Sequence, residues 1–475
     1  MRNAIRFAVR AGLFILALAL LTCALPRFEG NPDDALAAAV AAKGAKAPAV
    51  NDPGQPGPYE VGHASLVLHD PDRQADVLGN LADRPIPVDV FYPVDSDMIT
   101  ASTPEAVFPL DPINGLAALT YSSEWEEFGH DRVYEAPPPS AKKPFPLLVL
   151  SEGWGCATYF HNFFAGRLAS HGFVVAVVYH YGDWMFVWEP FDHIATAMLN
   201  RLKDVPFVLD ALLARNTTIG DPLGGVFDPE RIAASGFSLG GFACTALACG
   251  TGSIAEIWTF PGWIDFMGPP PADTLVPCTP DPRIKAIVPL DGSSWALRFA
   301  DLARVSVPAL GLGQEWSTLA LDPDPAWASQ QARQHAAFQG HPNYRVDIRD
   351  TIHQSFANVY AAVVLLYRKA AITEAEYEWL IENYCSSELS SSESNRLMAK
   401  YAIAFLKTAL AGESGYRNIL TPGYALTREQ YVEFFVTEKR SPSSIEEDWP
   451  FSWPSFKIYF EHQPGSAQAK AARKP

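Results

Sequence analysis

Gly236-Phe237-Ser238-Leu239-Gly240-Gly241 is the stretch that decides the fold of this chain. Its first five residues form a G-x-S-x-G pentad, which is typical of a sharp strand-to-helix turn that exposes a nucleophilic serine. The glycines two positions before and after the serine carry no Cβ, so the strand and the helix can pass each other closely. The pentad therefore predicts that Ser238 is the nucleophile of a serine hydrolase.

The sequence around the pentad has the order that such a turn requires. Asp228 to Arg231 has the composition of a turn, and Ile232 to Ser235 that of a short strand leading into the pentad. Leu239 to Cys249 is rich in Ala and Leu and lacks Pro, as expected of a buried helix. This context favours a nucleophile turn over a chance Gly-Ser-Gly turn.

Composition narrows the class of protein. The chain has 475 residues, 48% of them apolar, and a net charge of −17. Nucleic-acid binding is disfavoured, because a basic face supplies most of the affinity in such proteins. No HExxH, Walker loop or dinucleotide G-x-G-x-x-G occurs, so we expect neither a metal site nor a cofactor.

The N-terminus resembles a signal peptide over residues 1–24. Arg2, Arg6 and Arg10 precede an apolar run over residues 11–21, which is short for a membrane span. Cleavage after the Thr22-Cys23-Ala24 site, lipidation of Cys23 and retention as an anchor all remain open. Each route predicts an exported protein, periplasmic or secreted, with membrane association only through the N-terminus.

The rest of the chain divides by composition into four segments. We expect an Ala- and Pro-rich linker with little fixed structure over residues 25–58 and the main domain over residues 59–425. An aromatic-rich extension over residues 426–464 is expected to pack on that domain, and residues 465–475 are expected to be disordered.

The main domain alternates strand-like and helix-like segments. Alternating apolar and polar residues predict a strand over residues 86–92. Further strands are predicted over residues 145–150, 173–179, 284–290, 307–312 and 344–348, and the runs over 145–150 and 173–179 are continuously apolar. Apolar residues at helical spacing predict helices over residues 161–170, 204–213, 355–367 and 396–410, with a Ser- and Glu-rich loop over 386–394. This alternation predicts an α/β fold with a mostly parallel central sheet and helices on both faces.

A nucleophilic serine needs a base and an acid, which follow it in the order Ser, acid, His in α/β-hydrolases. His353 comes after the last predicted strand, where the base is expected. Asp291 directly follows the strand after the nucleophile helix, and Glu315 follows the next one. We predict Asp291 as the acid and keep Glu315 as the alternative.

Substrate contacts are predicted at the same edge of the sheet. The oxyanion of the intermediate requires two backbone N–H groups, which we assign to Leu239 and Trp154. Aromatic residues gather at the predicted strand ends, where ligands bind in open α/β sheets. The predicted walls of an acyl pocket are Trp184, Trp188, Trp295 and Trp316, although these residues could equally pack beneath residues 254–280.

Five cysteines remain beyond Cys23, so they cannot all pair within the chain. Export makes a disulfide plausible, and a bond between Cys249 and Cys278 would close the insertion after the nucleophile helix. Buried free thiols are the equal alternative, because cysteine packs well as a small apolar residue.

Several motifs together resemble a known family. They are Phe145 to Gly155, Leu168 to Ala176, the pentad, Pro289 to Gly292 and Ile352 to Phe356. The set closely resembles the platelet-activating factor acetylhydrolase-like and dienelactone hydrolase-like α/β-hydrolases of the secreted bacterial type. The resemblance implies an α/β-hydrolase fold, a carboxylic ester substrate with short or phospholipid-like acyl groups, and an acid at Asp291. Related polyester hydrolases place the acid one strand later, at the Glu315 position.

One position departs from the family pattern. Glu152-Gly153 stands where the family usually has His-Gly, in the loop that would supply the Trp154 N–H. A carboxylate there would oppose negative charge on the oxyanion unless it points away or is neutralised. The sequence therefore predicts a serine esterase, and a non-catalytic envelope protein with the same fold is the alternative.

Overall fold

The structure is a computed structural model. It describes residues 51–77, 79–109, 119–156, 159–183, 194–251, 278–292, 297, 299–314, 330–385 and 387–436.

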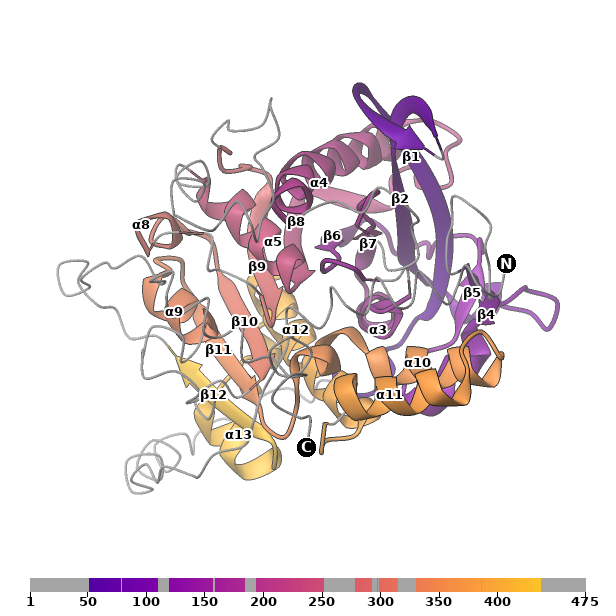
Figure 1. Cartoon of the computed structure of the whole chain (residues 1–475). Coiled ribbons are helices and arrows are strands. Elements are labelled where there is room, and N and C mark those ends of the chain that lie inside the picture. Colours follow the sequence, from indigo (N-terminus) through magenta and orange to yellow (C-terminus); the bar gives the residue numbers. More distant parts are fainter. Residues whose placement is uncertain are drawn as a thin grey trace, which may run out of the picture.

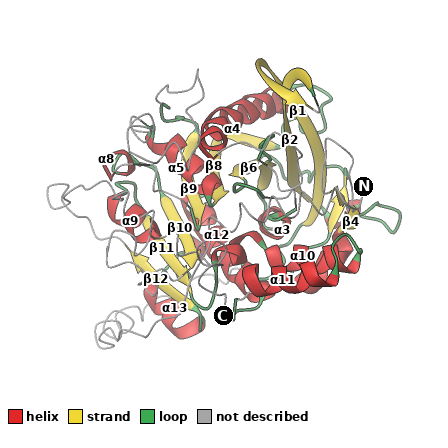
Figure 2. Ribbon diagram, viewed as in Figure 1, coloured by secondary structure: helices red, strands yellow, loops and turns green. Residues whose placement is uncertain are grey.

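One large sheet forms the centre of the described residues (Figures 1 and 2). Its strands lie in the order β12-β11-β10-β9-β8-β6-β7-β2-β1-β5. Their bounds are β1 Glu60–Val77, β2 Asn80–Val94, β5 Val133–Glu135, β6 Phe145–Ser151, β7 Val174–Val178, β8 Phe227–Phe237, β9 Ile284–Leu290, β10 Ala309–Gln314, β11 Asn343–Ile348 and β12 Val432–Val436. A separate hairpin pairs β3 Val107–Pro109 with β4 Leu119–Tyr121.

The strands from β7 to β11 are parallel to their neighbours, and the order β7-β6-β8 shows that the chain crosses over between them. At the two ends of this block, β2 pairs antiparallel with β7 and β12 pairs antiparallel with β11. The predicted α/β-hydrolase fold, with a mostly parallel sheet, is confirmed.

Helices cover both faces of the sheet (Figure 1). The α-helices are α3 Asn162–Ser170, α4 Ile194–Thr217, α5 Leu239–Cys249, α8 Phe299–Leu302, α9 Gln330–Ala337, α10 Val359–Arg368, α11 Glu374–Tyr384, α12 Ser391–Ala409 and α13 Pro422–Arg428. Short 3-10 helices are η2 Ser96–Met98, η3 Ser122–Phe128, η6 His353–Ala357 and η7 Ser414–Tyr416.

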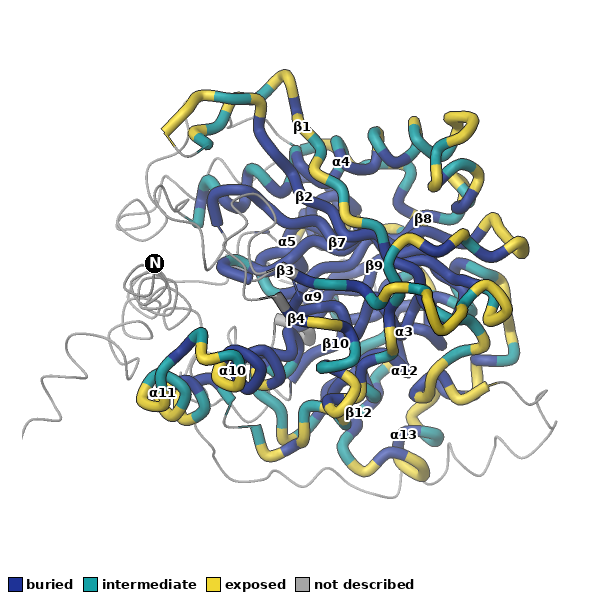
Figure 3. The backbone as a smooth tube through the Cα atoms, turned by 90° about the vertical axis from the view of Figure 1, so that its right-hand side faces the viewer, coloured by how far each residue is buried: buried dark blue, intermediate teal, exposed yellow. Residues whose placement is uncertain are grey.

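Two hydrophobic clusters lie on opposite faces of the sheet. Along β6, Leu148 and Leu150 join one cluster with α3, α10 and α12, while Leu147 and Val149 join the other with α4, α5 and α9. This alternation follows from the two-residue period of a strand, and both faces are apolar because helices cover both. Figure 3 shows the buried strands at the centre and the exposed residues at the periphery.

Several predicted boundaries differ from the structure. The turn expected over residues 228–231 lies inside β8, where the register against β6 shifts between Pro146 and Leu147. The helix expected over residues 355–367 is split at Asn358, whose φ is 46°. The loop expected over residues 386–394 is wrong beyond Ser390, because that hydroxyl accepts a hydrogen bond from the Glu393 N–H and begins α12.

The end of the predicted linker is fixed to the domain. Arg167 donates a hydrogen bond to the Gly54 carbonyl at 2.6 Å, and the Gly57 N–H donates to Ser170 Oγ at 2.9 Å. Lys400 on α12 lies 3.2 Å from a carboxylate oxygen of Asp52. Residues 52–57 therefore lie against α3 and α12, contrary to the expectation of little fixed structure there.

Candidate active site

The G-x-S-x-G pentad forms the turn between β8 and α5. Ser238 has φ 52° and ψ −114°, a left-handed backbone conformation that is strained for a residue with a side chain. The Ser238 N–H donates to the Leu290 carbonyl at 3.1 Å, which ties the turn to the end of β9. The side chain is half-buried.

Close backbone approach explains the glycines of the pentad. A Cβ at Gly236 would lie 2.2 Å from the Gly240 carbonyl oxygen, and one at Gly240 would lie 1.9 Å from the Ser151 carbonyl oxygen. Both distances are far below van der Waals contact. The turn and the end of β6 thus pack backbone to backbone, as the sequence argument requires.

Asp291 and His353 contact each other. His353 Nδ1 donates a hydrogen bond to Asp291 Oδ2. Asp291 follows β9 and is 2% exposed, whereas His353 begins η6 after β11 and is 9% exposed. Because a carboxylate oxygen accepts the hydrogen bond, this contact assigns a proton to Nδ1.

Further contacts orient the Asp291 carboxylate. The Gln314 backbone N–H donates to Oδ1 at 3.2 Å, and its side-chain amide donates to Oδ2 at 3.2 Å. The Asp291 N–H donates to the Leu312 carbonyl at 2.6 Å, and its φ of 40° lies in the left-handed region. The sequence did not indicate Gln314, since its position became visible only with the β9–β10 pairing.

Strand register aligns the nucleophile with the acid. Phe237 at the end of β8 pairs with Leu290 at the end of β9, so Ser238 and Asp291 follow their strands at matching positions. The Phe237 ring lies 4.5 Å from the His353 ring, centroid to centroid. The elements that carry Ser238, Asp291 and His353 therefore meet at the carboxyl edge of the parallel strands.

The loop after β6 carries Trp154 and is anchored at several points. The Glu152 N–H donates to the Val178 carbonyl at 3.3 Å, and the Glu152 carbonyl accepts from Arg201 Nε at 3.2 Å. The Gly155 N–H donates to the Asp183 carbonyl at 2.8 Å. Leu239 is the first residue of α5, so its N–H has no acceptor within the helix.

Glu152 lies in this loop with its side chain buried. Its Oε2 is 2.6 Å from Nδ1 of His161, the residue that precedes α3. Glu152 is 2% exposed and His161 is fully buried. The structure thus gives the unexpected carboxylate a partner, which the sequence did not predict because nine positions and an irregular loop separate the two residues.

His180 and Asp183 belong to buried polar networks. His180 Nε2 lies 2.8 Å from Ser151 Oγ, and His180 Nδ1 lies 2.9 Å from Asp204 Oδ2 on α4. Burial, followed by the nearby Arg201 charge, lowers the pKa of His180 to about 3. His180 is therefore neutral at ordinary pH, and Asp183 pairs with Arg201.

The predicted acyl-pocket residues fall in segments that the structure does not describe. Trp184, Trp188, Trp295, Trp316 and the alternative acid Glu315 all lie outside the described residues.

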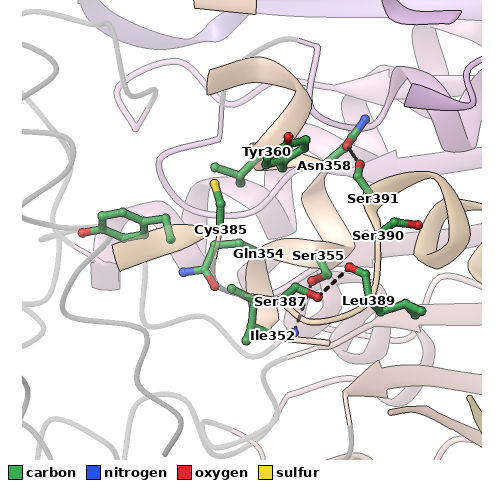
Figure 4. Close-up of a pocket in the computed structure, with 12 residues that line it drawn as sticks. Ile352, Gln354, Ser355, Asn358, Tyr360, Cys385, Ser387, Leu389, Ser390 and Ser391 are labelled. Carbon is green, nitrogen blue, oxygen red and sulfur yellow. Dashed lines mark hydrogen bonds between the residues drawn. The ribbon is translucent and has the colours of Figure 1, made fainter. Parts of the chain in front are cut away.

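A cavity of about 280 Å³ lies beside the histidine loop, among η6, α10, α11 and the start of α12 (Figure 4). Ile352 and Gln354, the two neighbours of His353, both line it. Gln354 is only 5% exposed, and no hydrogen bond joins its side-chain amide to another described residue. The walls carry no charged side chain, so the cavity suits a neutral group.

The described cysteines are free thiols: Cys156, Cys244, Cys249, Cys278 and Cys385. The proposed Cys249–Cys278 disulfide is therefore absent, and the alternative of free thiols describes these residues. Within the described ranges, no group of His, Cys, Asp and Glu side chains could hold a metal ion. None of the described helices is both long and apolar enough to cross a membrane.

The sheet and the nucleophile turn are those of an α/β-hydrolase fold, and Asp291 contacts His353 at the same edge of the sheet. Residues 46–185 match the family described as platelet-activating factor acetylhydrolase, isoform II. The matched residues include two of the motifs, Phe145 to Gly155 with Glu152 and Trp154, and Leu168 to Ala176, so the match confirms the resemblance over this part of the chain. It supports a hydrolase that acts on esters.

Among solved structures, a ferulic acid esterase from Streptomyces cinnamoneus is similar to this chain. It has a TM-score of 0.48 and 21% sequence identity, and the alignment covers 75% of this chain and 91% of that one. No curated protein matches the chain significantly.

Proposed function

We propose that this protein is a serine esterase of the carboxylic ester hydrolase class (EC 3.1.1), with a Ser238-His353-Asp291 triad. The observation that carries the proposal is the hydrogen bond from His353 Nδ1 to the Asp291 carboxylate, at the sheet edge where the nucleophile turn lies. The family match over residues 46–185 supports an ester as the substrate.

In the proposed mechanism, Ser238 Oγ attacks the ester carbonyl while His353 Nε2 takes the hydroxyl proton. Asp291 holds the imidazole and stabilises the imidazolium that forms. The backbone N–H groups of Trp154 and Leu239 donate to the oxyanion. His353 then protonates the departing alcohol, and water releases the acyl group from Ser238 through the same base.

We further propose that the cavity beside the histidine loop takes up part of the substrate. Its neutral walls fit an uncharged segment of an ester, and the buried Gln354 amide offers both N–H donors and a carbonyl acceptor. The family resemblance favours short or phospholipid-like acyl esters. The signal-like N-terminus favours an exported enzyme, with membrane association through that terminus.

A fluorophosphonate probe tests the nucleophile directly. The wild-type protein should be labelled and should hydrolyse p-nitrophenyl acetate, whereas Ser238→Ala should do neither. A well-folded wild-type preparation without labelling or turnover would instead support a non-catalytic envelope protein.

The acid is tested by comparing Asp291→Asn with Glu315→Gln. Removal of the true acid should lower kcat by about 10⁴-fold, as in other Ser-His-Asp triads. A loss of that size in Glu315→Gln alone would move the acid to the polyesterase position. A panel of p-nitrophenyl esters and phospholipids of increasing chain length then identifies the substrate class.

A further inference from the structure

The pair formed by Glu152 and His161 has no assigned role, yet it lies close to the residues on either side of Ser238. Glu152 Oε2 and His161 Nδ1 are 2.6 Å apart. Both side chains are almost completely buried, so they do not serve as a solvated surface ion pair. A buried carboxylate is strongly destabilising unless a donor satisfies it, and His161 supplies that donor.

Contacts connect this pair to the catalytic groups on two sides. Through its backbone, Glu152 belongs to the loop with the Trp154 N–H, and a Cβ at Gly240 would lie 2.8 Å from the Glu152 carbonyl oxygen. On the other side, the His161 ring lies 5.4 Å from the Phe237 ring, which lies 4.5 Å from the His353 ring. The pair therefore contacts both the loop and the residue that precedes the nucleophile.

The pair is incompletely satisfied, which argues against a purely stabilising role. Glu152 Oε1 and His161 Nε2 are buried and have no hydrogen-bond partner among the described residues. Two such atoms lower the stability of the fold compared with an apolar replacement of the same shape. Their presence beside a reacting centre points to a functional constraint.

The surrounding titratable groups leave the pair isolated. Arg201 on α4 pairs with Asp183 and directs its Nε to the Glu152 carbonyl rather than to the carboxylate. Burial, followed by the charge of Glu152, raises the pKa of Cys156 well above its ordinary value. Burial, followed by the charges of Asp89 and Glu152, does the same to Tyr179. Neither Cys156 nor Tyr179 carries charge near the loop.

We propose that Glu152 and His161 form a positioning pair for the oxyanion loop. His161 holds the Glu152 carboxylate toward the start of α3, away from the oxyanion, and thereby fixes the backbone that presents the Trp154 N–H beside the Leu239 N–H. This role rests on the proposed esterase function, and it explains how a carboxylate replaces the usual histidine of the family motif without opposing the developing charge.

The test compares two substitutions of His161. His161→Asn keeps an N–H donor near the position of Nδ1, whereas His161→Phe keeps the ring and removes the donor. We expect His161→Phe to lower kcat by about 10-fold to 100-fold with little change in KM, the range for losing one hydrogen bond to a charged group. His161→Asn should restore most of kcat.

Removal of the Glu152 carboxylate tests whether the loss of kcat in His161→Phe comes from an unpaired buried charge. In the double variant Glu152→Gln, His161→Phe no charged group lacks a donor, so its loss in kcat should be smaller than that of His161→Phe alone. For each variant, the rate is divided by the amount of serine that fluorophosphonate labels at completion. Unfolded protein is not labelled, so it does not enter the comparison.

A trifluoromethyl ketone probes the oxyanion hole, because its adduct with serine carries an oxyanion. Its inhibition constant should rise in His161→Phe by the same factor as kcat/KM falls. If His161→Phe lowers only thermal stability and leaves kcat and this inhibition constant unchanged, the pair is structural and the proposal fails. If the wild-type protein is itself neither labelled nor active, the esterase function fails instead.

Discussion

A buried histidine at the antiparallel end of the sheet tests how far two neighbouring carboxylates stabilise the fold. His63 on β1 is 1% exposed, and its Nε2 and Nδ1 lie 3.0 Å from carboxylate oxygens of Asp89 on β2 and Glu135 on β5. Burial alone would lower the pKa of His63, but Asp89 and then Glu135 outweigh it and raise the pKa from 6.5 to about 9. Since both carboxylates accept, both ring nitrogens donate and the ring is an imidazolium.

The contribution of protonated His63 to folding stability follows from this pKa. A rise from 6.5 to about 9, at about 1.4 kcal/mol per pKa unit, corresponds to about 3 kcal/mol of folding stability. Because the folded-state pKa is the higher one, this stability is fully present below pH 6.5 and is lost as the pH rises through about 9.

The perturbation is His63→Gln, and the assay is urea unfolding of both proteins between pH 6 and pH 10. The difference in free energy of unfolding between the wild type and His63→Gln should be about 3 kcal/mol greater at pH 6 than at pH 10. His69→Gln, at an exposed position on the same strand, is the matched control and should change stability by less than about 0.5 kcal/mol at every pH. An advantage for His63 that does not vary with pH would refute the reasoning.

Three further predictions concern packing and binding. Gly240→Ala places a Cβ 1.9 Å from the Ser151 carbonyl oxygen and should abolish fluorophosphonate labelling, while Gly166→Ala, whose Cβ would lie 3.7 Å from a Val133 methyl group, should keep it. Arg84→Met removes a buried partner of Asp204 and should lower the free energy of unfolding by about 3 kcal/mol, whereas Arg132→Met, at an exposed pair, should lower it by less than about 1 kcal/mol. Gln354→Leu should raise KM by about 5-fold to 10-fold with kcat unchanged for esters that reach the cavity, and an unchanged KM across the ester panel would place the substrate elsewhere.

The central strands and the nucleophile helix could be predicted because burial on both faces leaves a continuous apolar signature. The run from Ile284 to Leu290 and the helix from Leu239 to Cys249 have the predicted bounds. Edge strand β12 was not predicted, since its five residues carry no such signature and depend on pairing with β11. The start of α12 was missed because serines at a helix start resemble those of a loop.

In the candidate site too, residues with a local sequence signal could be predicted, whereas contacts that depend on tertiary pairing could not. Ser238, Asp291 and His353 were identifiable because each follows a predicted strand, Asp291 directly and His353 in the loop after the last one, where parallel strands bring such residues together. The partner of Glu152 was not identifiable, because nothing local in the sequence connects it with His161. Likewise, the Gln314 contacts to Asp291 depend on the register of two strands.

The backbone conformations of Ser238 and Asp291 set a limit on engineering this protein. Both residues have positive φ values, 52° and 40°, where glycine would relieve strain of about 1 kcal/mol or more. Glycine at either position would also remove a side chain of the proposed triad. Selection of variants for heat resistance alone would therefore favour glycine at these two positions and with it the loss of the proposed activity. A selection should measure ester hydrolysis as well as thermal stability.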